Sequence, residues 1–144
     1  MSDERITTHL QYLKKNLYAL EEIQKLNKTD FINDDIKVYA CERLFQKSIE
    51  SCINISNRIL SLEQTSKPVS APETYVDILN KLNELNIITG QQLENFSAMF
   101  RFRNRLVHVY WEIDPQNLYD YLQSRLIDFE DFISVTINYL NSRN

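Results

Sequence analysis

Apolar side chains recur every three or four residues along most of the chain, the spacing that gathers them on one face of an α-helix. In the first stretch this apolar face consists of Leu10, Leu13, Leu17, Leu20 and Ile23. In the second it consists of Val38, Cys41, Phe45, Ile49, Cys52 and Ile59. The pattern predicts five helices, at about residues 3–26, 34–62, 73–86, from 91 through the segment 101–110, and 115–140. We therefore expect an all-α fold, an antiparallel bundle of four to five helices.

Few residues interrupt these helices. The chain has one glycine and three prolines, and two of the prolines fall in the segment 64–72 (QTSKPVSAP), which is predicted to be a long loop. Residues 27–33 are predicted to be a shorter connection, Gly90 marks the turn before the fourth helix, and Asp114-Pro115 is a typical helix start. Neither side of the long loop could bury its apolar face alone, so residues 1–144 are expected to form a single domain.

Composition narrows the class of protein. Of the 144 residues, 43% are hydrophobic and 25% charged, which is ordinary for a globular protein. No apolar run reaches the roughly 18–20 residues of a membrane span, and the N-terminus lacks a signal-peptide core, so we expect a cytoplasmic protein with no membrane contact. The net charge of −4 argues against a general nucleic-acid coat protein. Any contact with nucleic acid must come from a local basic patch.

The cysteines and histidines do not form a recognisable metal site. Cys41 and Cys52 are eleven residues apart in one predicted helix, which places them about 16 Å apart, too far for a disulfide. We expect both to be reduced core residues. The sequence has neither a paired-cysteine motif nor a Glu-x-x-His pair, so neither a metal ion nor another cofactor is expected.

The segment 101–110 is basic in an otherwise acidic chain. It contains three arginines, and His108 is one of only two histidines in the protein. On a helical wheel one broad arc is apolar, and the opposite arc carries Arg101, Asn104, Arg105 and His108. Histidine can both take and give a proton near neutral pH, and the planar guanidinium of arginine suits a phosphate. This combination favours chemistry on a phosphodiester.

Arg103 departs from this division because it falls near the centre of the apolar arc. An unpaired charge there would cost several kcal/mol. Arg103 is therefore either part of a structural ion pair, for which Glu42 is a candidate, or a functional group held in place. Taken singly, the other polar residues of the segment are compatible with a solvated helix face, and Tyr110 with a core residue.

The chain resembles the HepT toxins, a branch of the HEPN ribonuclease superfamily, in the signature Arg-x4-His-x-Tyr. It carries this signature as Arg103-Asn-Arg-Leu-Val-His108-Val-Tyr110. The flanking sequence agrees, from Met99 through Glu112-Ile-Asp114, and so does Glu42-Arg-Leu-Phe-Gln46 in the second predicted helix. The five-helix layout extends the resemblance to essentially the whole chain and implies a HEPN-like fold.

This resemblance implies a metal-independent ribonuclease whose catalytic residues are Arg103, Asn104 and His108. His108 would act as acid–base catalyst while the RNA 2′-OH attacks the adjacent phosphate. Arg103 would neutralise charge on the phosphate oxygens, and Asn104 would orient the histidine ring or donate to the phosphate. Arg101 and Arg105 would steer the RNA. DNA lacks the attacking hydroxyl and should be spared.

The spacing of the two main residues raises a geometric question. Arg103 and His108 are five positions apart, which is roughly 140° on an ideal helix. They could meet through the long reach of the arginine, through a local irregularity of the helix, or across a homodimer in which two motifs face each other.

The resemblance also implies a protein partner, an MntA-type nucleotidyltransferase antitoxin that attaches AMP to Tyr110. Phosphates added beside Arg103 would occupy it and repel RNA. The alternative is a catalytically inactive HEPN protein that binds substrate or nucleotide for a nucleotidyltransferase. Transfer RNA and messenger RNA are both compatible targets for an active enzyme.

Overall fold

The computed structural model describes residues 3–64, 74–107 and 113–143. Within these ranges the chain contains no strand and forms six helices: α1 (Glu4–Gln24), α2 (Lys28–Ile32), α3 (Asp35–Glu63), α4 (Tyr75–Glu84), α5 (Gly90–Val107) and α6 (Pro115–Ser142). The predicted all-α bundle is confirmed. In the same ranges, no helix is long and apolar enough to cross a bilayer. The predicted loop at 64–72 lies outside the described residues except for its first position.

The short helix α2 was not predicted, because residues 27–33 were expected to be only a connection. Its start is capped by the side chain of Asn27, which accepts a hydrogen bond of 2.8 Å from the Asp30 backbone N–H. Phe31 is fully buried and fixes the turn against α6 through the ring of Tyr119, at 5.5 Å. One cap and one buried aromatic residue are thus enough to close a helical turn that is too short to show periodicity.

The turn between α4 and α5 depends on Asn86 and not on Gly90. Asn86 has a φ of 61°, the left-handed conformation that often ends a helix. Its N–H and that of Ile87 donate to the carbonyls of Asn83 and Leu82. Gly90 instead is the first residue of α5, and a Cβ placed on it would meet nothing within 4 Å. The expectation that glycine makes this turn was therefore wrong.

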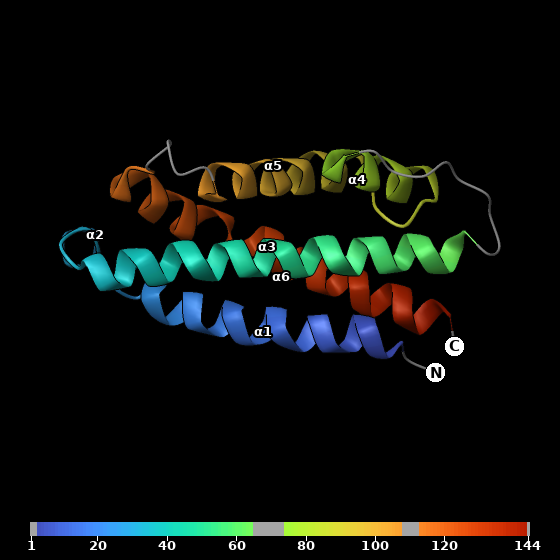
Figure 1. The fold of residues 1–144 in the computed structure, drawn as a ribbon, viewed down its shortest axis with the longest axis horizontal. Coiled ribbons are helices and arrows are strands. Elements are labelled where there is room, and N and C mark those ends of the chain that lie inside the picture. Colours follow the sequence, from blue (N-terminus) through green and yellow to red (C-terminus); the bar gives the residue numbers. More distant parts are fainter. Residues whose placement is uncertain (1–2, 65–73, 108–112, 144) are drawn as a thin grey trace.

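The long helices pack antiparallel along a common axis (Figure 1). Helix α3 occupies the middle, with α1 beside it on one edge and α4 and α5 on the other, while α6 crosses behind. The C-terminal half of α5, which begins the basic segment, therefore lies along the first half of α3.

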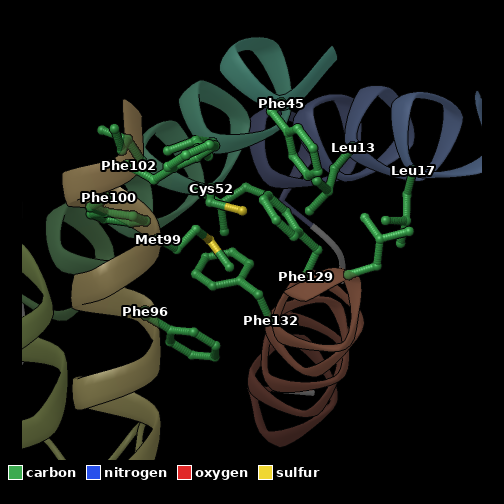
Figure 2. Close-up of a cluster of buried hydrophobic side chains, with 14 of the residues drawn as sticks. Leu13, Leu17, Phe45, Cys52, Phe96, Met99, Phe100, Phe102, Phe129 and Phe132 are labelled. Atoms are coloured by element: carbon green, nitrogen blue, oxygen red, sulfur yellow. The ribbon is translucent and has the colours of Figure 1, made fainter. Parts of the chain in front are cut away.

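Aromatic side chains join α5 to α3 and α6 (Figure 2). Phe102 of α5 packs edge-on against Phe45 of α3 at 6.0 Å and stacks on Tyr121 of α6 at 3.8 Å between ring centres. One and a half turns earlier, Phe96 contacts Phe132 of α6 at 5.2 Å. Buried aromatic pairs add to the free energy gained from burial itself. They hold α5 in a fixed register, and with it the residues on either side of Phe102.

Both cysteines are free and buried, as expected from their spacing. Burial raises the pKa of the Cys41 thiol to about 12 and also raises the pKa of the Cys52 thiol. Because only the thiolate is nucleophilic or binds metal, both groups are inert at neutral pH.

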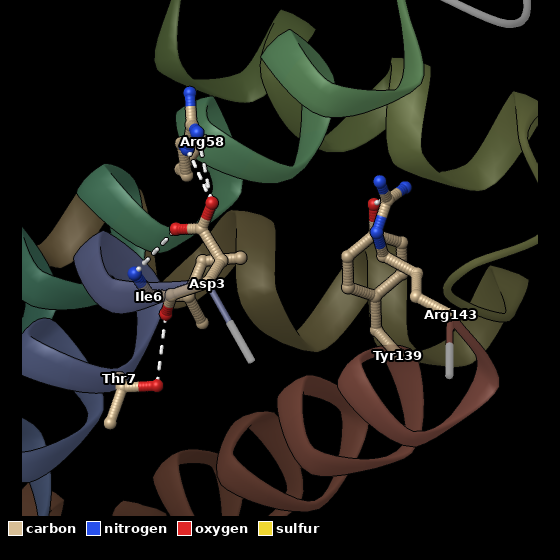
Figure 3. Close-up of polar contacts among 6 residues, drawn as sticks. All are labelled: Asp3, Ile6, Thr7, Arg58, Tyr139 and Arg143. Carbon is tan, nitrogen blue, oxygen red and sulfur yellow. Dashed lines mark hydrogen bonds and ion pairs between the residues drawn. The ribbon is translucent and has the colours of Figure 1, made fainter. Parts of the chain in front are cut away.

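The start of α1 is tied to α3 by one carboxylate (Figure 3). Asp3 caps α1 by accepting a hydrogen bond of 3.1 Å from the Ile6 N–H. Its other oxygen accepts two hydrogen bonds from Arg58, at 3.0 Å from Nε and 2.9 Å from Nη2. These bonds lower the pKa of the Asp3 carboxyl, so it stays ionised well below neutral pH. The pair fixes one end of the surface where α1 and α3 meet.

Candidate functional site

The candidate site begins with the way α5 is held at its N-terminus. Thr89 Oγ1 accepts a hydrogen bond from the Gln92 N–H at 3.1 Å, and Gln92 Oε1 accepts one from the Thr89 N–H at 2.9 Å. This reciprocal pair is a capping box. Gln92 also donates to Asp131 of α6 at 3.3 Å. Both ends of the described part of α5 are therefore anchored, by polar contacts at the start and by Phe102 near the end.

The predicted division of α5 into two faces holds for its described residues. The apolar positions Phe96, Met99, Phe100 and Phe102 are buried, whereas Arg101, Asn104 and Arg105 are exposed. The Arg105 guanidinium lies 5.8 Å from the Phe102 ring. His108 and Tyr110 fall within residues 108–112, outside the described residues. The structure thus places three of the predicted polar residues on one surface.

Arg103 lies at the boundary between the buried and exposed faces, with 22% of its side chain exposed. Its Nη2 donates to Glu50 Oε2 at 3.4 Å, and its guanidinium lies 5.3 Å from the centre of the Tyr75 ring. Its Nε is buried and has no hydrogen-bond partner among the described residues. The guanidinium is therefore held on one side by a carboxylate and on another by an aromatic face.

The ion-pair partner of Arg103 is Glu50 and not the predicted Glu42, which lies about two turns earlier in α3. The reason is the register of the two helices. Phe102 packs on Phe45, and a long helical side chain such as that of Arg103 leans back toward the N-terminus of its own helix, which in this antiparallel pair is toward Glu50. The helical wheel indicated that Arg103 needs a carboxylate partner. Which carboxylate it reaches depends on how α5 is aligned along α3, and that alignment is set by tertiary packing.

Glu50 is the centre of a small polar network on α3. Its Oε2 also accepts a hydrogen bond from Gln46 Nε2 at 3.2 Å, and its Oε1 lies 4.0 Å from Lys47 Nζ. Because several groups orient the carboxylate, it can in turn fix the direction in which Arg103 points. A phosphate approaching Arg103 would meet a guanidinium that is already in place, with less side-chain entropy to lose.

A groove of about 520 Å³ adjoins this arginine. Three helical regions line it: Asn57 of α3, residues 74–76 and Ile78 at the start of α4, and Phe100 and Asn104 of α5. Tyr75 belongs to this lining and also contacts Arg103, so the groove and the arginine are neighbours. The side-chain amides of Asn57 and Asn104, together with the partly exposed ring of Tyr75, suit an unstacked nucleobase. Tyr75 could not be assigned to this site from the sequence, because no local pattern links the start of α4 to the basic segment.

Comparison with known proteins gives consistent matches over most of the chain. Residues 13–136 match the family described as "Ribonuclease HepT-like". A tRNA nuclease HepT from Aphanizomenon flos-aquae (strain 2012/KM1/D3) is 24% identical over 135 residues, which cover 94% of this chain and 89% of that protein. An mRNA nuclease HepT from Shewanella oneidensis is 33% identical over 90 residues, which cover 62% of this chain and 65% of that protein.

A solved structure has the same helical arrangement. It is a tri-AMPylated Shewanella oneidensis HEPN toxin in complex with MNT antitoxin, and it superposes on this chain with a TM-score of 0.83. The match is 25% identical in sequence and covers 94% of this chain and 98% of that one.

Proposed function

Because this chain belongs to the HepT-like ribonuclease family, we propose that it is a metal-independent endoribonuclease toxin of a toxin–antitoxin pair. The structural observation that supports this is the placement of Arg103, which Glu50 and Tyr75 hold at the edge of a groove that Asn104 lines. The substrate is cellular RNA, and relatives named as tRNA and mRNA nucleases support either class of target. Its site of action is the cytoplasm.

The reaction assigned to this site is an internal transesterification. The RNA 2′-oxygen attacks the adjacent phosphorus, the bond from phosphorus to the 5′-oxygen breaks, and a proton moves from the 2′-hydroxyl to the leaving oxygen. His108 carries this proton transfer. Arg103 stabilises the charge that builds on the phosphate oxygens, and Asn104 orients the imidazole or donates to the phosphate. The products are a 2′,3′-cyclic phosphate and a 5′-hydroxyl end.

Arg101 and Arg105 supply steering charge at this surface. Both are exposed on the same face of α5 as Asn104, where they attract RNA phosphates without taking part in the chemistry. The patch is small in a chain of net charge −4, so RNA binding engages few phosphates and weakens only modestly as salt is raised.

A test of this proposal compares RNA with DNA of the same sequence. The purified protein should cut the RNA in the presence of EDTA, because none of the assigned roles requires a metal ion. It should leave the DNA intact, because DNA has no 2′-hydroxyl to attack. Mass spectrometry of the products should find 2′,3′-cyclic phosphate ends. Cleavage of both polymers, or 3′-hydroxyl ends, would argue for a different nuclease mechanism. Absence of any RNA cleavage would favour an inactive HEPN partner protein.

The proposed partner is an MntA-like nucleotidyltransferase antitoxin that adds AMP to Tyr110 of a homodimeric toxin. The complex of an AMPylated HEPN toxin with an MNT antitoxin supports this assignment. AMP brings negative phosphates close to Arg103, where they occupy the guanidinium and repel the RNA backbone.

Tyr110→Phe is expected to remain active in the presence of the antitoxin, because phenylalanine has no hydroxyl to accept AMP. Mass spectrometry after co-expression should find AMP on the parent protein and none on this variant. Tyr18→Phe is a matched control, since Tyr18 is exposed on α1 and should leave AMPylation unchanged. AMP found at full occupancy on Tyr110→Phe would place the modification at another residue.

A further inference from the structure

A second groove, of about 400 Å³, runs along the surface where α1 meets α3. Helix α1 contributes His9, Tyr12 and Asn16, which are spaced to share one face, and helix α3 contributes Lys47, Glu50, Ser51 and Asn54. Nothing in the ribonuclease site described above uses these residues except Glu50.

Glu50 connects this groove to Arg103. One carboxylate oxygen accepts the hydrogen bond from Arg103 Nη2 at 3.4 Å, and the other lies 4.0 Å from Lys47 Nζ. The negative charge of Glu50 is thus balanced from both sides, and the groove does not repel an anion. A strand whose phosphate sits at Arg103 can pass over Glu50 and enter the groove directly.

The lining has the side-chain types that bind an unstacked nucleotide. Tyr12 is 57% exposed, so one face of its ring can receive a base. The side-chain amides of Asn16 and Asn54 form no hydrogen bond with any other part of the chain that the structure describes, and they can donate to or accept from a base edge. Lys47 offers a positive charge for a backbone phosphate. Every lining side chain carries a polar group, which can pair with the polar groups of a nucleotide.

The two helices that form the walls of the groove are held together before any ligand arrives. The hydrogen bonds between Asp3 and Arg58 tie α1 to α3 beyond its His9–Asn54 end (Figure 3). Beneath it, Leu13 of α1 and Ile49 of α3 are fully buried. Because the backbone of both walls is fixed, only the lining side chains lose conformational entropy when a nucleotide binds.

We propose that the groove between α1 and α3 binds a nucleotide of the RNA strand that flanks the cleaved bond. Its base stacks on Tyr12, the amides of Asn16 and Asn54 contact the base edge, and Lys47 contacts the adjoining phosphate. This inference rests on the proposed ribonuclease function, and it gives the enzyme a means of selecting sequence that is separate from the catalytic residues.

The test compares Tyr12→Ala with the matched control Tyr18→Ala on a short single-stranded RNA of mixed sequence. Tyr18 lies on the same helix and is 66% exposed, but it points roughly 120° away from Tyr12. Tyr12→Ala should lower kcat/KM by about 5- to 150-fold, the loss expected when one base–aromatic stack is removed. The loss should appear in KM, with kcat kept at saturating RNA. Tyr12→Phe retains the ring and should restore the parent KM, and Tyr18→Ala should match the parent.

A second measurement follows the salt dependence of RNA binding. Lys47→Ala should reduce the slope of log affinity against log salt by about one, because one phosphate contact is lost. If Lys47→Ala leaves the slope unchanged and Tyr12→Ala leaves KM unchanged, the inference is overturned while the ribonuclease function stays intact.

The remaining outcomes are also distinguishable. If the parent protein cuts no RNA, the ribonuclease proposal is wrong and the RNA groove with it. If Tyr12→Ala cuts RNA normally but is no longer silenced by the co-expressed nucleotidyltransferase, the groove binds that protein and the RNA assignment is overturned.

Discussion

His108→Ala is expected to cut RNA about 10²–10⁴-fold more slowly than the parent protein, the usual contribution of a positioned acid–base side chain. Alanine can neither take the proton from the 2′-hydroxyl nor return one to the leaving 5′-oxygen. The initial rate at saturating RNA measures this step directly. Induced expression of the variant should also fail to arrest growth.

Two controls separate lost chemistry from lost structure in His108→Ala. The variant should unfold at the same temperature as the parent, and it should bind RNA with similar affinity, because Arg103 and the steering arginines remain. A variant that melts early or no longer binds RNA would assign His108 a structural or binding role.

Arg103→Ala is expected to lower kcat by about 10²–10³-fold, the cost of removing one group that stabilises transition-state charge. Arg103→Lys keeps the positive charge but loses the planar fork that lies between Glu50 and the Tyr75 ring. Lysine should therefore recover only part of the rate. Initial rates on the same RNA should decrease from the parent through Arg103→Lys to Arg103→Ala.

The control for Arg103 is an arginine elsewhere in the bundle that also pairs with a carboxylate. Arg125 of α6 lies 3.6 Å from Asp128, and 44% of its side chain is exposed. Arg125→Ala removes an arginine–carboxylate pair within one helix and should leave RNA cleavage unchanged. The fold should tolerate Arg103→Ala, because Glu50 retains Gln46 and Lys47 as partners. Full activity of Arg103→Ala would limit Arg103 to a structural ion pair.

The activity of a mixture of Arg103→Ala and His108→Ala proteins shows whether Arg103 and His108 act within one chain or across two. If the residues act within one chain, a mixture of Arg103→Ala and His108→Ala proteins stays inactive. If two motifs face each other in a homodimer, mixed dimers contain one site with both residues intact, and activity returns to a fraction of the parent rate.

Much of the bundle could be predicted from the sequence because it follows from local periodicity. Each long helix has a continuous apolar face, and every position of α1 and α3 predicted to face inward is buried, although Ile6, Ile53, Ile55 and Leu60 are buried as well. The same wheel placed Phe102 inside and Arg101, Asn104 and Arg105 outside, as the structure has them. These assignments depend only on the residues of one helix.

The contacts that could not be predicted depend on how helices meet. Glu50 was missed because the register of α5 on α3 is set by Phe102 and Phe45, which are far apart in the sequence. Tyr75 was missed because α4 follows a segment with no periodic pattern. Helix α2 depends on one cap and one buried ring, and Asn86, not the sole glycine, adopts the left-handed turn. Each of these is a tertiary or single-residue effect.

The central claim is that the motif of Arg103 and His108 cleaves RNA without a metal ion. The most direct measurement is the initial rate of RNA cleavage by the parent and by His108→Ala, side by side, with and without EDTA. The parent is expected to cut at the same rate in both conditions, and His108→Ala is expected to be slower by at least about 10²-fold in both. A parent silenced by EDTA, or a His108→Ala variant as fast as the parent, would contradict this mechanism.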